Sequence, residues 1–325
     1  MILHEDSKLF NEAIRATAQR MDILDIYIEK DYWVCYALNL IFKGAFKDLV
    51  VFKGGTALSK CHEIIERFSE DIDLVVLTEA HDTDSQKAAK LRRLSKSLTA
   101  PLIEVVVDGI TNKKGQIRKV AFNYPKAFKG NYGQARDKIV LEASIFGSSE
   151  PFTTTNLTTY IYQTMIEVGQ EALVKNYQLE PFEVKVLDIK RTFCEKIMSL
   201  VRFSNSETPI VDLNNKIRHT YDIFKLLAVE EIQEFFSTSD FDMMLKTVAE
   251  DDVIGYKNNN QWLRKQPSEA MIFKNPEGVW EQLRNTYNTN FKNLVYGELP
   301  NEIDILKAIQ KVSKRLESIK WNIKV

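Results

Sequence analysis

The sequence predicts an α+β protein in which a mixed α/β region is followed by a helical C-terminal part. Three observations predict this class. Strand and helix patterns alternate up to about residue 188, helical patterns replace them afterwards, and 325 residues are enough for about two domains. We therefore expect an α/β domain with N-terminal helices over residues 1–188. A helical domain that contributes to the active-site cleft is expected over residues 189–325.

The first domain is expected to open with helices and then to alternate strands with helices. Apolar residues at helical spacing predict helices within residues 1–45. One further helix is expected over residues 57–68 with Thr56 as its N-cap, and a basic helix follows, capped by Asp84 or Ser85. Short apolar runs bounded by turn residues predict strands at residues 49–52, 72–77, 102–107, 116–124 and 138–146, with short additions at 160–163 and 182–186.

Helical periodicity dominates the second domain. Its expected helices span residues 189–201, 217–227, 230–236 and 304–318. The polar stretch at residues 204–215 contains one proline and is expected to be a loop. Residues 237–325 contain three tryptophans and no motif that indicates chemistry.

The composition is that of a globular protein. Hydrophobic residues make up 44% and charged residues 27%, which excludes a disordered or fibrous chain. No apolar run approaches the roughly 20 residues that cross a bilayer, and the first residues lack the pattern of a secretory signal. Cys35, Cys61 and Cys194 are widely spaced and odd in number, as in a reducing compartment. We therefore expect a cytoplasmic protein without a membrane partner.

Charge is balanced overall but concentrated in one segment. The formal net charge is −1, yet residues 87–138 contain thirteen Lys or Arg and three acids, a net +10 that leaves −11 elsewhere. Such a segment predicts a face for a polyanion such as RNA. Phe122, Tyr124, Phe128 and Tyr132 alternate with lysines there and are candidates for stacking on unpaired bases. The alternative is a solvated helix followed by strands whose aromatic residues face the core.

A diglycine followed by two alternating aspartates is the most informative pattern. Gly54 and Gly55 end the first expected strand, and consecutive glycines let backbone N–H groups approach a phosphate. Asp71 and Asp73 lie on the next expected strand and point to the same face, where they repel each other unless a divalent cation lies between them. An isolated D-x-D is more often a solvated strand edge. After a diglycine, in strand–helix–strand order, it predicts a Mg²⁺ or Mn²⁺ site for transfer from a nucleoside triphosphate.

These residues resemble a known family. The sequence K-G-G-T at residues 53–56 and R-F-S-E-D-I-D at 67–73 is similar to the signature of DNA-polymerase-β-like nucleotidyltransferases. With T-F-C-E-K at residues 192–196 and R-H-T-Y-D at 218–222, it resembles more narrowly the AbiEii/AbiGii toxins of bacterial abortive-infection and toxin–antitoxin systems. The resemblance implies a polymerase-β-like fold, an NTP substrate, a role in phage defence and an antitoxin encoded by a separate gene.

The resemblance also implies roles for individual residues. Asp71 and Asp73 would bind the metal, Ser69 and Lys196 would contact the triphosphate, and Asp222 would be a further catalytic acid. The remaining candidates for nucleotide binding are Gly54, Gly55, Thr56 and Arg67, in the first two segments, and Lys190, on the expected helix that begins at residue 189.

The residues themselves leave several of these roles open. Lys196 follows Glu195 and is also explained by a solvated helix face, while Asp222 is also explained as a solvated or capping acid. Glu142 is an acid in an apolar strand, which is costly unless it is paired or bound to metal, so it is the candidate third carboxylate. Glu104 and Asp108 are rivals for that role.

The leading functional hypothesis is a Mg²⁺-dependent nucleotidyltransferase that transfers NMP from an NTP to an RNA end, with tRNA as the expected acceptor. The basic segment favours RNA as the partner. A second hypothesis keeps this chemistry with a protein or small-molecule hydroxyl as acceptor. A third is a catalytically silent binding module that retains the fold.

Overall fold

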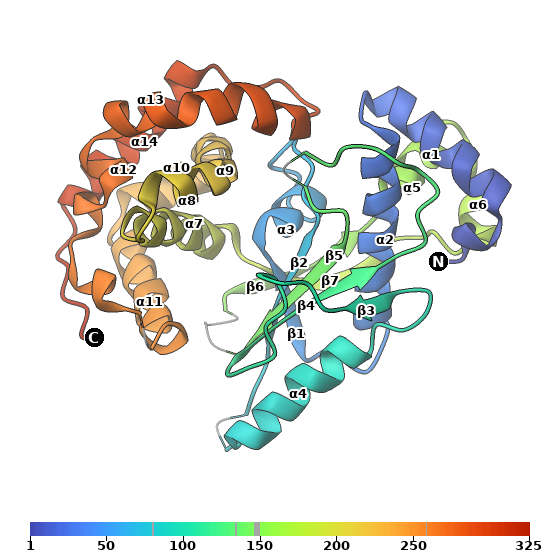
Figure 1. The fold of residues 1–325 in the computed structure, drawn as a ribbon, viewed down its shortest axis with the longest axis horizontal. Helices are drawn as coiled ribbons and strands as arrows, with labels where there is room; N and C mark the ends of the chain where they lie inside the picture. The colour runs from blue at the N-terminus through green and yellow to red at the C-terminus, as the bar shows by residue number, and fades with distance from the viewer. Residues whose placement is uncertain (80, 134, 146–149, 258) are drawn as a thin grey trace. The chain divides into compact units, whose positions relative to one another are not determined.

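The chain forms two compact units. The computed structural model describes residues 1–79, 81–133, 135–145, 150–257 and 259–325. Unit 1 comprises Met1–Glu63, Arg67–Ile145 and Phe152–Leu187. Unit 2 comprises Asp188–Val325, Ile64–Glu66 and the described residues of Phe146–Pro151. Unit 1 contains a mixed sheet with helices and unit 2 is helical, so the predicted α+β class is confirmed (Figure 1).

A mixed sheet is the core of unit 1. Within the described residues it has seven strands in the order β3-β4-β5-β2-β1-β7-β6. Their bounds are β1 Val50–Lys53, β2 Asp71–Val76, β3 Ile103–Val105, β4 Ile117–Asn123, β5 Ile139–Ser144, β6 Phe152–Leu157 and β7 Phe182–Leu187. The pairs β2–β5 and β1–β7 are parallel and the other neighbours are antiparallel. The central strands β1, β2 and β5 are largely buried, as their Val-, Ile- and Leu-rich sequences require.

Six α-helices accompany this sheet in the described residues of unit 1. They are α1 Ser7–Met21, α2 Asp25–Phe42, α3 Gly54–Lys60, α4 Asp84–Lys96, α5 Tyr160–Glu167 and α6 Glu171–Asn176. The apolar helix α2 is buried along most of its length and contacts β2, β5 and β7, whereas the basic helix α4 contacts β4 and β5. Figure 1 shows α1, α5 and α6 grouped beside α2, with α4 apart from them.

Several expected boundaries in unit 1 were wrong. Helix α3 begins at Gly54 and ends at Lys60, so Thr56 lies inside it and is not its N-cap. Thr83 caps α4 in a capping box with Gln86, so the expected caps Asp84 and Ser85 are instead the first two residues of the helix. Residues 160–163 begin α5, because the Thr159 side chain caps a helix there, and the threonine-rich edge strand β6 was not expected.

Unit 2 is built around a central helix. Its helices are α7 Ile189–Ser204, α8 Pro209–Asn215, α9 Ile217–Leu227, α10 Glu230–Ser237, α11 Ser239–Gly255, α12 Met271–Lys274, α13 Pro276–Thr286 and α14 Glu302–Glu317. Helix α7 contacts α8 to α12, and Phe193 on α7 packs against Phe236 and other rings. The expected loop at residues 204–215 was partly wrong, because Pro209 starts α8 at a position that suits proline. None of the helices in the described residues has the length and apolar character needed to cross a membrane.

Candidate active site

A row of charged side chains crosses four neighbouring strands of unit 1. Asp73 on β2 is in register with Glu142 on the parallel strand β5 and with Lys53 on the antiparallel strand β1. Glu142 is in turn in register with Lys119 on β4. Residues in register share a face of the sheet, and Asp71 shares it because it lies two residues before Asp73. The sheet therefore brings three carboxylates together between two lysines.

Cations from the same unit neutralise the outer carboxylates. Arg136, on the segment between β4 and β5, places Nη1 3.0 Å from Oδ1 and 3.2 Å from Oδ2 of Asp71. Lys119 donates to Oε2 of Glu142 at 2.7 Å. Both pairs keep between a quarter and two fifths of their side-chain surface exposed, so solvent ions and ligands can reach them.

The central carboxylate has the most unfavourable position of the three. Burial, together with the charges of Glu142 and Asp71, raises the pKa of Asp73 to about 7. Lys53 and Lys119 oppose this shift but do not cancel it. The ionised form of Asp73 is therefore disfavoured both by burial and by the two neighbouring carboxylates.

The diglycine lies directly against these residues. Gly54 has φ +81°, a conformation that favours glycine, and a Cβ there would lie 2.3 Å from Oδ2 of Asp73. A Cβ on Gly55 would lie 2.6 Å from Nη2 of Arg67 and 2.9 Å from Oγ of Ser69. A side chain at either position would therefore force Asp73, or Arg67 and Ser69, to shift from the places they occupy.

Hydrogen bonds connect α3 to the start of β2. The Thr56 hydroxyl donates to the backbone carbonyl of Asp71 at 2.7 Å and lies 3.1 Å from Oγ of Ser69. Arg67 is buried, and its Nη1 donates to the carbonyl of Phe68 at 3.1 Å. The structure thus brings together Gly54, Gly55, Thr56, Arg67, Ser69, Asp71, Asp73 and Glu142. It places Thr56 and Arg67 beneath the diglycine as supports, and Ser69 beside it. Of the two rival acids, Glu104 lies on β3 and pairs with Lys113, and Asp108 is exposed.

The carboxylate row has the right chemistry for a divalent cation. Its donors are all carboxylate oxygens, the ligand type that Mg²⁺ and Mn²⁺ prefer. In the described part of the chain, no three His, Cys, Asp or Glu side chains converge closely enough to hold a metal ion as they stand. In this structure Arg136 and Lys119 hold the carboxylates of Asp71 and Glu142 in ion pairs. Asp71, Asp73 and Glu142 fit a cation that takes the place of these partners.

Lys196 and Asp222 form a second ionic group, within unit 2. Nζ of Lys196 on α7 donates to Oδ2 of Asp222 on α9 at 2.6 Å, and their side chains are 6% and 0% exposed. The alternatives of a solvated lysine and a solvated acid are therefore wrong. The Nδ1 atom of His219, one turn before Asp222, is buried and has no hydrogen-bond partner among the described residues. Burial, with the nearby charges of Lys196 and Lys216, lowers its pKa well below the ordinary value.

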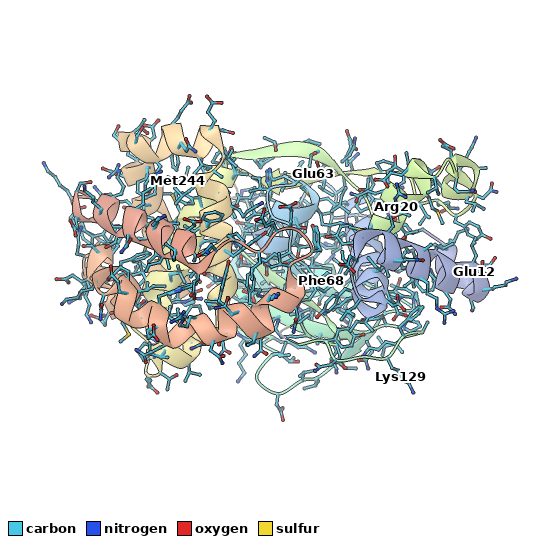
Figure 2. All side chains as sticks on the ribbon, turned by 90° about the horizontal axis from the view of Figure 1, so that it is seen from above. Glu12, Arg20, Glu63, Phe68, Lys129 and Met244 are labelled. Atoms are coloured by element: carbon cyan, nitrogen blue, oxygen red, sulfur yellow. The ribbon has the colours of Figure 1, made fainter. Side chains whose placement is uncertain are left out.

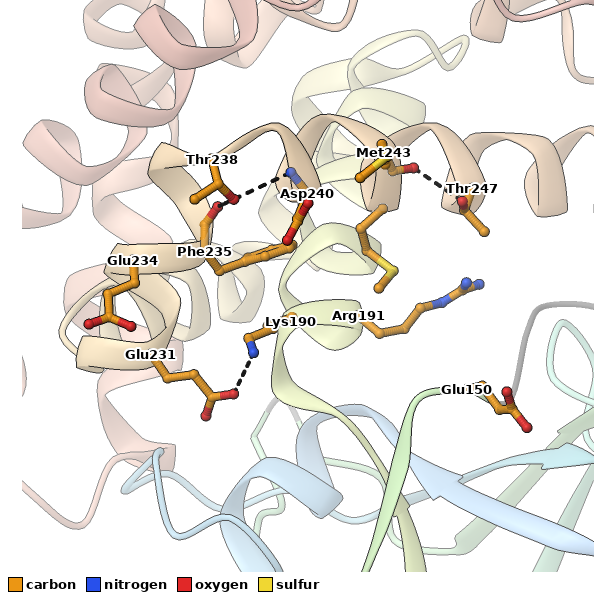
Figure 3. Close-up of a pocket in the computed structure, with 11 residues that line it drawn as sticks. Glu150, Lys190, Arg191, Glu231, Glu234, Phe235, Thr238, Asp240, Met243 and Thr247 are labelled. Atoms are coloured by element: carbon orange, nitrogen blue, oxygen red, sulfur yellow. Dashed lines mark hydrogen bonds and ion pairs between the residues drawn. The ribbon is translucent and has the colours of Figure 1, made fainter.

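Lys190 lies apart from this pair, at an acidic cavity of unit 2. Its Nζ pairs with Oε1 of Glu231 at 2.7 Å (Figure 3). The cavity has a volume of about 520 Å³, and its lining also includes Glu150, Glu234 and Asp240. So many carboxylates disfavour a triphosphate at this position.

Only part of the basic segment at residues 87–138 is available for contacts with a polyanion. Six of its thirteen cations form ion pairs with acids within the described residues: Lys90, Lys113, Lys119, Lys126, Arg136 and Lys138. Arg92, Arg93 and Lys96 are exposed near the C-terminal end of α4. Phe122 and Tyr124 are buried in the core, so the stacking interpretation was wrong for them, whereas Phe128 and Tyr132 are half-buried.

Arg136 and Lys119 contact the candidate site, but neither was predicted from the sequence as a site residue. Both were counted only as part of the basic segment. Lys119 was within reach of prediction, because the hairpin of β4 and β5 pairs it with Glu142. Arg136 was not, since it reaches Asp71 from a loop 65 residues away in the sequence.

The fold and the carboxylate row are those expected of a nucleotidyltransferase. A family model described as "Nucleotidyl transferase AbiEii toxin, Type IV TA system" matches residues 37–310, and the chain therefore belongs to this family. It is a nucleotidyltransferase that uses an NTP, and it is the toxin of a type IV toxin–antitoxin system, which pairs it with a separate antitoxin. A comparison with curated proteins found no match.

Proposed function

We propose that this toxin transfers a nucleoside monophosphate from an NTP to the end of an RNA, with tRNA as the acceptor, and that the reaction depends on Mg²⁺ or Mn²⁺. The observation that carries the proposal is the row of Asp71, Asp73 and Glu142 against the diglycine. When bound, a divalent cation would supply positive charge at the reacting phosphate and favour the ionised form of the attacking hydroxyl.

The proposal gives the residues of the chain the following roles. Asp71 and Asp73 hold the cation, with Glu142 as the third carboxylate. Gly54, Gly55 and Ser69 present backbone N–H groups and a hydroxyl to the phosphates, a role that their mutual contacts support. In the reaction, the acceptor oxygen bonds to the α-phosphorus as the bond to the β-phosphate oxygen breaks, and pyrophosphate leaves.

Lys196 and Asp222 are proposed to act as the cation for the triphosphate and a further catalytic acid. Their support is the buried ion pair, because isolating two charges from water is costly and is often retained for function. Lys196 supplies a compact cation that balances phosphate charge, and Asp222 orients it.

Exposed cations of the basic segment support RNA as the acceptor. Arg92, Arg93 and Lys96 project from one helix and suit contacts with phosphates. Replacing all three by glutamine should weaken RNA binding and reduce the slope of log K against log salt by about 2, at roughly 0.7 per lost contact with single-stranded RNA. An unchanged slope would remove this helix from the RNA interface.

Incubation with labelled nucleotides tests the whole proposal. The purified toxin is given each α-labelled NTP with Mg²⁺ and total RNA, and in parallel without RNA. Label entering tRNA, abolished by EDTA, is the expected result. Label entering protein or a small molecule would replace RNA as the acceptor. No label in any fraction, with growth inhibition that survives Asp71→Asn, would leave only a silent binding module.

A further inference from the structure

The segment between β4 and β5 is tied to α2 by several polar contacts. We call residues 124–133 and 135–138 the β4–β5 loop. The buried carboxylate of Glu29 accepts hydrogen bonds from the backbone N–H groups of Ala127 at 2.6 Å and Phe128 at 3.2 Å. The hydroxyl of Tyr27 donates to the carbonyl of Tyr132 at 3.0 Å. These contacts fix the course of the loop, while exposed residues such as Lys129 point outward (Figure 2).

The backbone of Arg136 is held by two buried charged side chains. Its N–H donates to Oε1 of Glu70 at 3.1 Å, and its carbonyl accepts a hydrogen bond from Nζ of Lys30. Both side chains are fully buried, and burial lowers the pKa of Lys30 to about 8 against the opposing charges of Glu70 and Asp71. Burying two ionisable groups is unfavourable, and here both buried groups hold the backbone of one loop residue.

Arg136 both contacts a candidate catalytic carboxylate and lines a cavity. Its Nη1 contacts both carboxylate oxygens of Asp71, and the residue also lines a cavity of about 320 Å³ within unit 1. The cavity is therefore next to the candidate catalytic carboxylates. A guanidinium binds phosphate oxygens with the same planar donors that it uses for a carboxylate.

The cavity combines the groups that recognise a single nucleotide. Its lining includes the apolar residues Val107 and Ile110, together with Tyr132, Asn131 and three charged residues, Arg136, Asp137 and Lys138. Lys138 is paired with Asp137 at 3.0 Å, which leaves Arg136 as the cation for a phosphate. The volume lies at the lower end of the range for small-ligand sites, which suits one base with its sugar. Apolar and aromatic residues suit a base, the Asn131 amide suits its edge, and Arg136 suits its phosphate.

We propose that this cavity binds one unpaired nucleotide, with its base between Tyr132 and Ile110 and its phosphate on Arg136. The proposal rests on the nucleotidyl transfer proposed above and assigns a nucleotide site to the same unit. In the ligand-free protein Arg136 holds Asp71; a phosphate offers it an alternative anion and frees the carboxylate. The nucleotide is either the incoming NTP or the terminal nucleotide of the acceptor, which present the same chemistry.

Equilibrium binding to the full-length toxin tests this site. A nucleoside triphosphate and a short single-stranded RNA are titrated separately, in EDTA and again with Mg²⁺, into wild type, Ile110→Trp and Arg136→Gln. The tryptophan fills the cavity, and the glutamine removes the cation. Each substitution should weaken the binding of one of the two ligands at least tenfold and leave the affinity for the other within twofold of wild type. The ligand that is lost identifies the source of the nucleotide.

Matched variants separate a loss of binding at this cavity from a general loss of folding. Val106→Trp places the same bulky ring on a neighbouring exposed residue and should leave both affinities unchanged. Arg136→Lys keeps the charge and should recover part of the lost affinity, even if Ile110→Trp fails to fold. Equal binding of both ligands by wild type, Ile110→Trp and Arg136→Gln would overturn the site. So would a wild-type toxin that transfers label but binds neither ligand in this way. Absence of transfer by wild type with every NTP would instead contradict the proposed function.

Discussion

The carboxylate row of unit 1 and the buried ion pair of unit 2 both place carboxylates next to cations, but the two groups differ in their exposure to solvent. Asp71 and Glu142 keep 25% and 39% of their side-chain surface exposed and are paired with equally accessible cations. Asp222 is fully buried, as is most of Lys196. Exposed pairs of this kind contribute little to stability and exchange partners readily, whereas a buried pair is costly to break.

This difference assigns different roles to the two groups. Arg136 and Lys119 can leave their carboxylates when a ligand brings a competing charge, because water stabilises the separated ions. Lys196 and Asp222 depend on each other for their charged states, so their geometry is fixed before any substrate binds. The first group is suited to binding and release, and the second to a preset orientation.

The largest expected effect comes from breaking the buried pair. Lys196→Met leaves the carboxylate of Asp222 buried without its cation and should lower the free energy of unfolding by about 3–5 kcal/mol. The matched variant Lys119→Met removes an exposed partner and should cost less than about 1 kcal/mol. Urea unfolding measures both. The double variant Lys196→Met/Asp222→Asn should regain much of the loss, and equal effects of the two single variants would contradict the comparison.

Neutralising the centre of the carboxylate row should affect activity and leave stability unharmed. Asp73→Asn removes one anion from a repelling group, so the melting temperature should stay constant or rise. Transfer of label from NTP should fall about 10²–10³-fold, the usual loss for a group that stabilises charge at a reaction centre. Asp48→Asn, at an exposed acid, serves as control and should retain activity. A fully active Asp73→Asn enzyme would place the reaction elsewhere.

The diglycine should be sensitive to one added methyl group. Gly54→Ala introduces a Cβ 2.3 Å from Asp73 at a positive φ, so it should both displace the carboxylate and cost about 1–2 kcal/mol of backbone strain. Gly109→Ala has a similar φ of +72° with nothing within 4 Å of the added Cβ, and it isolates the strain. Thermal unfolding should show a loss for both variants, larger for Gly54→Ala because its Cβ also meets Asp73, while transfer activity should fall only for Gly54→Ala. Equal activity would separate the diglycine from the reaction.

The smallest effect is a pH dependence that comes from unit 2. His219 is neutral in the folded state because burial lowers its pKa, whereas the unfolded chain takes up a proton below its ordinary value of about 6.5. Its contribution to stability is therefore complete above pH 6.5 and decreases below it, by at most about 1.4 kcal/mol per pH unit. Urea unfolding from pH 7.5 to 5 should be less pH-dependent for His219→Gln. An identical profile would show that other groups dominate.

Local patterns were enough to predict most of the sheet and the centre of the candidate site. The alternation of acidic and apolar residues at 71–74 predicted β2, and the i, i+2 spacing placed both aspartates on one face. Residues 152–157 were missed because threonines on an exposed edge strand resemble a polar loop. Residues 160–163 have the β-branched and aromatic composition of a strand, but the cap at Thr159 starts a helix there.

The remaining site residues depend on tertiary structure. Glu142 faces Asp73 only because β5 lies parallel to β2, a pairing that no local pattern specifies. Arg136 contacts Asp71 only because Glu70 and Lys30 hold its backbone from two other elements. The burial of Lys196 and Asp222 likewise follows from the packing of α7 on α9. Long-range contacts of this kind explain why the sequence left these roles open.

Anomalous diffraction from crystals of the toxin grown with Mn²⁺ and a non-hydrolysable NTP analogue would locate the cation. We expect a manganese peak bound by the carboxylates of Asp71 and Asp73, with the triphosphate beside Gly54 and Gly55 and with Arg136 released from Asp71. A bound nucleotide with manganese at other residues, or with the Asp71–Arg136 pair still intact and no metal beside it, would contradict the account.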